Sequence, residues 1–114
     1  MIGKKTKEKN SILKDKLSKT NHTIDLIKNK GALPGIKVDK GLAPIDSSPE
    51  ETVTLGLDGL DERGKEYFSL GAKFTKWRAV IKISDDIPSN DCIQANMRAL
   101  AKYAKIVQNN NMVP

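Results

Sequence analysis

The alternation of apolar and polar positions predicts strands and helices in turn over most of the chain. Residues 33–39 have the composition of a buried strand, and residues 57–68 carry apolar side chains at helical spacing. Gly71 is typical of the end of that helix. Residues 77–83 are apolar on both faces apart from two cations, as parallel strands are.

A second helix is predicted to begin at Pro88 and Ser89 and to end at the Asn109–Asn111 run. Five residues of this helix form one apolar stripe: Ile93, Met97, Leu100, Ala104 and Val107. Residues 112–113 then begin another apolar run, so the order is strand, helix, strand, helix and incipient strand. We therefore expect residues 33–39 and 77–83 to be adjacent parallel strands, with the intervening helix on one face.

Residues 1–22 are polar and rich in lysine, and they contain few apolar side chains. We interpret residues 1–22 as a disordered or degenerate leader and residues 23–114 as the folded segment. Residues 24–27 predict a short helical or turn-like apolar patch that ends near Gly31. His22 is expected to lie in an exposed loop.

Composition and charge narrow the choice of partners. The net charge of +6 comes from residues 1–30, where nine lysines outnumber three acidic residues, while residues 31–114 are balanced. The leader lacks arginine and interleaved aromatic residues, so nucleic-acid binding is not the first expectation. No apolar run could span a bilayer, and no membrane partner is expected. The single Cys92 excludes an internal disulfide and fits a reducing cytoplasm, as a small buried or half-buried side chain.

Two pairs of charged residues interrupt the predicted strands. Lys37 and Asp39 must share one face, and so must Lys76 and Arg78, because strand side chains alternate. Buried charges are costly unless they are paired or serve chemistry. From the residues alone, the four could form a buried ion network without a reactive role, or a functional site. Trp77 faces the opposite way and is expected to pack against a helix.

Three sequence blocks carry a family resemblance: Gly35-Ile-Lys-Val-Asp-Lys-Gly41, Gly56-Leu-Asp-Gly-Leu60 with Glu62-Arg63, and Gly71-Ala-Lys-Phe-Thr-Lys-Trp-Arg78. In order and spacing, the segment from about Ile24 to the last residue resembles class I fructose-bisphosphate aldolase. The resemblance implies an incomplete (β/α)8 TIM barrel, with roughly two βα units and the start of a third strand. A complete barrel needs roughly 250 residues, so we expect a truncated piece.

The resemblance also implies chemistry. Class I aldolases are glycolytic lyases that cleave fructose 1,6-bisphosphate reversibly to dihydroxyacetone phosphate and glyceraldehyde 3-phosphate, through a lysine imine and without a metal or other cofactor. By resemblance, Lys37 and Lys76 contact the sugar phosphate and Lys76 is catalytic. Asp39 and Arg78 also belong to the substrate-binding set. Asp39 orients and neutralises the lysines, and Arg78 pairs with acidic groups in the barrel centre.

The resemblance places the imine-forming lysine and the acid/base glutamates beyond this chain. The isolated chain is therefore expected to be inactive. A full-length protein would be a cytoplasmic homo-oligomer.

Two other functions are compatible with the residues. The chain could be a non-catalytic basic adaptor that binds nucleic acid or anionic surfaces through its lysine-rich leader, or an interaction fragment with exposed strand edges. No cluster of His and Cys predicts a zinc site. Asp58 and Asp61 are interpreted as charges that favour a helix dipole, and Glu50 and Glu51 as members of an exposed loop.

Overall fold

The computed structural model describes Lys19 and residues 21–114, and these described residues divide into two compact units, one up to Pro34 and one from Gly35 to Pro114. In the first unit residues 21–29 form a helix that ends before Gly31, whose φ of 78° is left-handed. The predicted apolar patch is thus helical. His22 is exposed as expected, but it lies in this helix and not in a loop. Most of the predicted leader lies outside the described residues.

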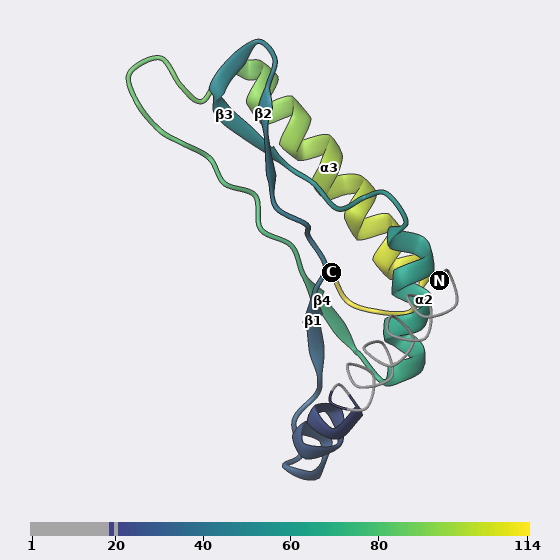
Figure 1. The fold of residues 1–114 in the computed structure, drawn as a ribbon. Coiled ribbons are helices and arrows are strands. Elements are labelled where there is room, and N and C mark those ends of the chain that lie inside the picture. The colour runs from purple at the N-terminus through teal and green to yellow at the C-terminus, as the bar shows by residue number, and fades with distance from the viewer. Residues whose placement is uncertain (1–18, 20) are drawn as a thin grey trace, which may run out of the picture. The chain divides into compact units, whose positions relative to one another are not determined.

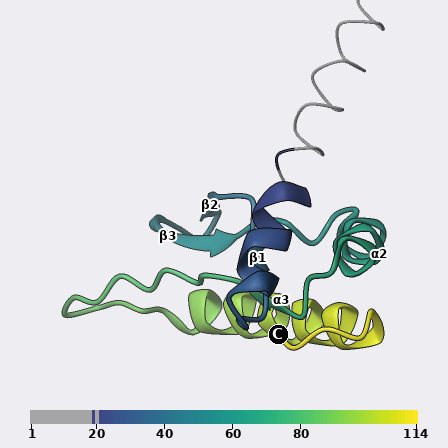
Figure 2. The same cartoon turned by 90° about the horizontal axis from the view of Figure 1, so that it is seen from below.

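The second unit is α/β with few strands (Figure 1). Its elements are β1 (Gly35–Lys37), β2 (Leu42–Ile45), β3 (Ser48–Thr54), α2 (Leu60–Leu70), β4 (Phe74–Lys76) and α3 (Asn90–Asn109). β1 pairs with β4, and β2 pairs with β3. α3 packs against β3 and α2, and Figure 2 shows it running along one side of this unit. Within the described residues, no helix is long and apolar enough to cross a membrane.

The pairing of β1 with β4 is parallel, as predicted, but its position along the chain differs from the prediction. Lys37 is the register partner of Lys76, so residues 74–76, and not 77–83, lie beside β1. Residues 77–83 form no strand. Threonine hydroxyls of β3 donate to carbonyls there, from Thr54 to Arg78 at 2.7 Å for example, so side chains replace part of a backbone ladder.

A third parallel strand begins where the sequence predicted it. Val113 forms a parallel bridge with Phe74. The Thr75 N–H donates to the Val113 carbonyl at 2.8 Å, and the Val113 N–H donates to the Lys73 carbonyl at 3.0 Å. β4 therefore has a parallel neighbour on each side.

The expectation of a buried strand over 33–39 is wrong in its extent. Only residues 35–37 are strand, Leu33 is 68% exposed, and the buried residues of the segment are Pro34 and Val38. The inner face of β1 and β4 carries Ile36 and Thr75, which lie beside the core, whereas Lys37 and Lys76 are exposed. The face that carries Lys76 also carries Phe74, which is 43% exposed, so the two lysines lie on a partly apolar outer face.

β2 and β3 form an antiparallel hairpin where Glu50 and Glu51 were expected to lie in an exposed loop. Asp46 and Ser47 form its turn, and the β-branched run Thr52-Val53-Thr54 favours the extended conformation of β3. Glu50 and Glu51 consequently lie in a strand and not in an exposed loop. Glu50 is exposed, with its Oε2 3.4 Å from the Lys82 ammonium.

α2 agrees with its prediction. It ends at Gly71, whose φ is 109°, and Asp61 lies in its first turn, where a negative charge favours the helix dipole. Asp61 accepts a hydrogen bond from the Asn110 side chain at 2.9 Å and lies 3.1 Å from Lys65. The bonds from Asn110 and Lys65 hold the pKa of Asp61 below its usual range. Asp58 is exposed just before the helix.

α3 starts as predicted, but it buries a different face. Ser89 is the N-cap, and its hydroxyl accepts from the Cys92 N–H at 3.2 Å. The buried residues of α3 are Cys92, Asn96, Ala99, Tyr103 and Val107. Of the predicted stripe, Val107 is buried, but Ile93, Met97 and Leu100 are 39%, 57% and 38% exposed. The buried face can include the polar Asn96 because its amide donates to the Thr52 carbonyl at 2.9 Å.

Two single residues behave as predicted. Trp77 stacks on Tyr103 of α3, with ring centroids 4.9 Å apart, and so packs against a helix. Cys92 is fully buried. Its burial and the neighbouring Glu51 raise the pKa of the thiol, which makes it an inert packing group.

The observed face of α3 gives a stability prediction. We expect Val107→Ala to lower the free energy of unfolding by about 2 kcal/mol, because two buried methyl groups are lost. Met97→Ala should change it by less than about 0.5 kcal/mol, because that side chain is mostly in water. Urea unfolding of the two variants measures both values. Equal losses would show that the predicted stripe is buried after all.

Candidate functional site

Two lysines lie side by side at the carboxyl ends of the parallel strands. Lys37 ends β1, Lys76 ends β4, and they are direct register partners. Paired residues of neighbouring strands project to the same face, and the strands lie about 4.8 Å apart. Both ammonium groups are therefore presented on the face opposite the core. The sequence placed Lys37 on the first strand, but the second strand was predicted to begin at residue 77, and the register of the two lysines was not predicted.

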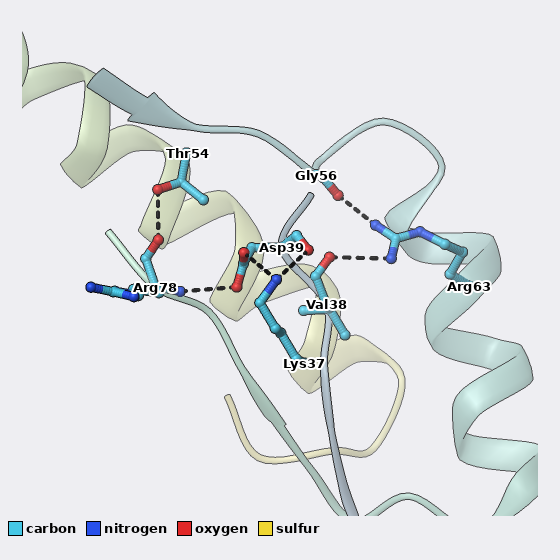
Figure 3. A network of polar contacts seen from close by, with 7 residues as sticks. All are labelled: Lys37, Val38, Asp39, Thr54, Gly56, Arg63 and Arg78. Carbon is cyan, nitrogen blue, oxygen red and sulfur yellow. Dashed lines mark hydrogen bonds and ion pairs between the residues drawn. The ribbon is translucent and has the colours of Figure 1, made fainter. Parts of the chain in front are cut away.

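Asp39 joins the two strand ends (Figure 3). Its Oδ1 lies 2.9 Å from the Lys37 ammonium, and its Oδ2 accepts from the backbone N–H of Arg78 at 3.2 Å. The Asp39 side chain is 6% exposed, while that of Lys37 is 56% exposed. The carboxylate is thus held within the protein, and its cationic partner faces water.

The pKa of Asp39 reflects this arrangement. Burial of the carboxyl raises its pKa. The hydrogen bonds from Lys37 and from the Arg78 N–H, together with the charges of Lys37 and Lys76, lower the pKa by more than burial raises it. The net result is a pKa below the usual range. Asp39 therefore remains a carboxylate at neutral pH and keeps its ion pair with Lys37.

Arg78 takes part mainly through its backbone. Its N–H donates to Asp39, and its carbonyl accepts from the Thr54 hydroxyl. The guanidinium is directed away from Asp39 in Figure 3, and Arg78 is exposed. Among the described residues the ion pairs do not include Arg78 or Lys76. The pairing of Arg78 with acidic groups stays a prediction.

A second polar cluster, around Glu51, was missed in the sequence. Glu51 is 1% exposed, and its Oε2 accepts from the backbone N–H of Ser89 at 2.9 Å. Hydrogen bonds from Ser89 outweigh the effect of burial and lower the pKa of Glu51 to about 2. The Glu51 carboxylate thereby links β3 to the start of α3 by a hydrogen bond. The β-branched run after Glu51 was the available signal for a strand.

The other chemistry of the described residues is limited. They contain no group of three or more His, Cys, Asp or Glu side chains that could hold a metal ion. An open hollow of about 420 Å³ adjoins the hairpin, and its lining includes Lys40, Gly56 and Asp58 but neither Lys37 nor Lys76. The Lys37 side chain at the strand end, which is 56% exposed, faces water instead.

Comparisons with known proteins identify the family of the chain. The family model described as Fructose-bisphosphate aldolase class-I matches residues 9–114. A probable fructose-bisphosphate aldolase class 1 of Xylella fastidiosa (strain Temecula1 / ATCC 700964) is 60% identical over 84 residues, covering 74% of this chain and 25% of the relative. The cytosolic fructose-bisphosphate aldolase 4 of Arabidopsis thaliana is 50% identical over 91 residues, covering 80% and 23%.

A solved structure gives the same result for the fold. Fructose-bisphosphate aldolase from Plasmodium falciparum, in a complex with TRAP and a small molecule inhibitor, superimposes with a TM-score of 0.77 at 47% identity. The match covers 80% of this chain and 27% of that one. This chain is thus similar to lyases that carry their chemistry on an α/β fold. It belongs to the class I fructose-bisphosphate aldolase family, and it spans about a quarter of the length of the curated relatives it matches.

Proposed function

We propose that this chain is the substrate-binding segment of a class I fructose-bisphosphate aldolase. The reaction is the reversible cleavage of fructose 1,6-bisphosphate to dihydroxyacetone phosphate and glyceraldehyde 3-phosphate through a lysine imine. The observation that carries the proposal is the register pairing of Lys37 with Lys76 at the carboxyl ends of adjacent parallel strands, in a chain of this family. In TIM barrels the active site lies at that end of the strands.

Each site residue has a role in this proposal. Lys37 and Lys76 supply point charges for the sugar phosphate, with Lys76 nearest the reacting carbons, and Arg78 supplies a planar fork. Asp39 holds Lys37 and the Arg78 backbone in position. Lys37 shares its ammonium protons with Asp39, so it suits binding better than nucleophilic attack. We therefore propose that the isolated chain forms no imine and needs the rest of the barrel for activity.

The remaining features complete the proposal. β1, β4 and the strand beginning at Val113 would be consecutive strands of an eight-stranded barrel, with α2 and α3 outside it and the lysine face inside. Residues 1–22 would be a leader outside the catalytic unit, and 23–114 the barrel segment. The assembled enzyme would be a cytoplasmic homo-oligomer that binds a sugar phosphate, with no metal and no nucleic acid.

A segment exchange tests the function. The aligned 84 residues of the Xylella relative would be replaced by the matching residues of this chain, and fructose 1,6-bisphosphate cleavage would be measured. We expect activity within about tenfold of the parent, because the strand-end residues would be supplied in place. The control is the relative with its own 84-residue segment cut out and put back by the same cloning steps. A chimera that folds as an oligomer but cleaves no substrate would contradict the proposal.

A further inference from the structure

Arg63 of α2 reaches two backbone carbonyls at once (Figure 3). Its Nη1 donates to the Val38 carbonyl at 3.2 Å, and its Nη2 donates to the Gly56 carbonyl at 2.7 Å. Its Nε is buried and finds no acceptor within the described part of the chain. The guanidinium is thus committed to these two carbonyls.

The first of these carbonyls lies between the two residues of the site ion pair. Val38 separates Lys37 from Asp39 and is 1% exposed. Its N–H donates to the Lys76 carbonyl at 3.0 Å, and its own carbonyl accepts from Arg63. The backbone at this point is therefore held on one side by β4 and on the other by α2.

The second carbonyl belongs to a loop that lies directly on the same backbone. Gly56 has a φ of 131°, and a Cβ there would meet the Lys40 nitrogen, the Asp39 Cα and the Val38 oxygen at 3.0–3.1 Å. The Lys40 N–H also donates to the Leu55 carbonyl at 2.7 Å. Arg63 therefore bridges the end of β1 and the loop after β3.

We propose that Arg63 is a positioning residue for the strand-end site: its fork fixes the Val38 peptide against the Gly56 loop, and so sets the directions of Lys37 and Asp39. This inference rests on the proposed function only for what the site binds, and it concerns how the site is held. The planar fork of arginine spans two acceptors, whereas the ammonium of lysine is a point charge. The geometry therefore requires arginine and not simply a cation.

The test is Arg63→Lys in the 114-residue chain, which retains the charge and loses the fork. We expect the hydrogen-exchange protection of the Arg78 amide to fall about tenfold, the equivalent of one hydrogen bond, because its acceptor Asp39 is no longer held. The pKa of the Asp39 carboxyl, followed by carbon NMR, should rise toward its ordinary value as the contacts with Lys37 and the Arg78 N–H loosen. Both readouts unchanged in a folded variant would overturn the proposal.

Two controls separate positioning from general loss of stability. Arg98→Lys changes an exposed arginine of α3 and should leave both readouts at their wild-type values. Val107→Ala destabilises the core cluster to which Val38 also belongs but leaves the Arg63 fork in place, so the Asp39 pKa should stay at its wild-type value in it. If Val107→Ala raised that pKa as much as Arg63→Lys does, the effect would be one of stability and the proposal would fail.

If Arg63→Lys does not fold, a measurement on the wild-type chain tests the role of Arg63 instead. In the wild-type chain, the Arg63 Nη protons should be resolved and should rotate and exchange at least tenfold more slowly than those of Arg98. Equal rates would overturn the proposal. None of these readouts involves a sugar phosphate, so an inactive chimera would contradict the proposed function while leaving the role of Arg63 standing.

Discussion

Lys76→Ala in the chimeric aldolase should lower kcat/KM for fructose 1,6-bisphosphate by about 10²–10³-fold. A cation directed at the charge that develops in the transition state is worth this much in an enclosed site. Lys76 lies beside Lys37 in the strand register, so its removal leaves one ammonium where the proposed site uses two. Steady-state cleavage rates over a range of substrate concentrations measure the loss.

The matched control is Lys40→Ala, which removes an exposed lysine near the same strand end. Lys40 lines the hollow beside the hairpin and not the lysine pair, so its loss should change kcat/KM by less than about threefold, as uniform surface charge does. Comparable losses in the two variants would show that only general positive charge matters, and Lys76 would lose its proposed role.

Glu51→Gln should lower the thermal midpoint of the 114-residue chain by roughly 5–10 °C. The substitution keeps the shape of the side chain but removes the buried negative charge that accepts from the Ser89 N–H at the start of α3. The pKa of Glu51 is about 2 in the folded chain, against an ordinary 4.5. The carboxylate therefore stabilises the fold above pH 4.5, and this contribution is lost as pH falls from about 4.5 toward 2.

A pH series checks the origin of that effect. As pH falls from about 4.5 toward 2, the wild type should progressively lose its advantage over Glu51→Gln, and the two unfolding midpoints should converge near pH 2. Glu50→Gln is the control, because Glu50 is exposed and its contact with Lys82 is a surface ion pair of small effect. An advantage of the wild type that persisted undiminished at pH 3 would contradict the role of the Glu51 charge.

The parts of the fold that depend on local signals could be predicted from the sequence. Ser89 and Gly71 mark helix ends because an N-cap hydroxyl and a left-handed glycine act within one turn. The strand–helix–strand order also follows from local pattern. The resemblance carried by the blocks around Lys37 and Lys76 gave the family, which comparison with known proteins then showed.

The rest depends on contacts between distant residues. The buried face of α3 includes Asn96, because the Thr52 carbonyl is there to accept its hydrogen bond. A stripe chosen for hydrophobicity alone selects Met97 in its place. Glu51 was assigned to an exposed loop for the same reason: a charged residue is placed in water unless its partner, here the N–H of Ser89, is known.

The bond between Glu51 and Ser89 has a consequence for synthesis on the ribosome. The two residues are 38 positions apart, so the hairpin leaves the ribosome before its partner helix exists. At about 5–20 residues per second, that interval lasts roughly 2–8 s. During it the face of β3 that carries Glu51 has no helix to cover it. During this interval the exposed face of β3 is open to misassociation and to chaperones.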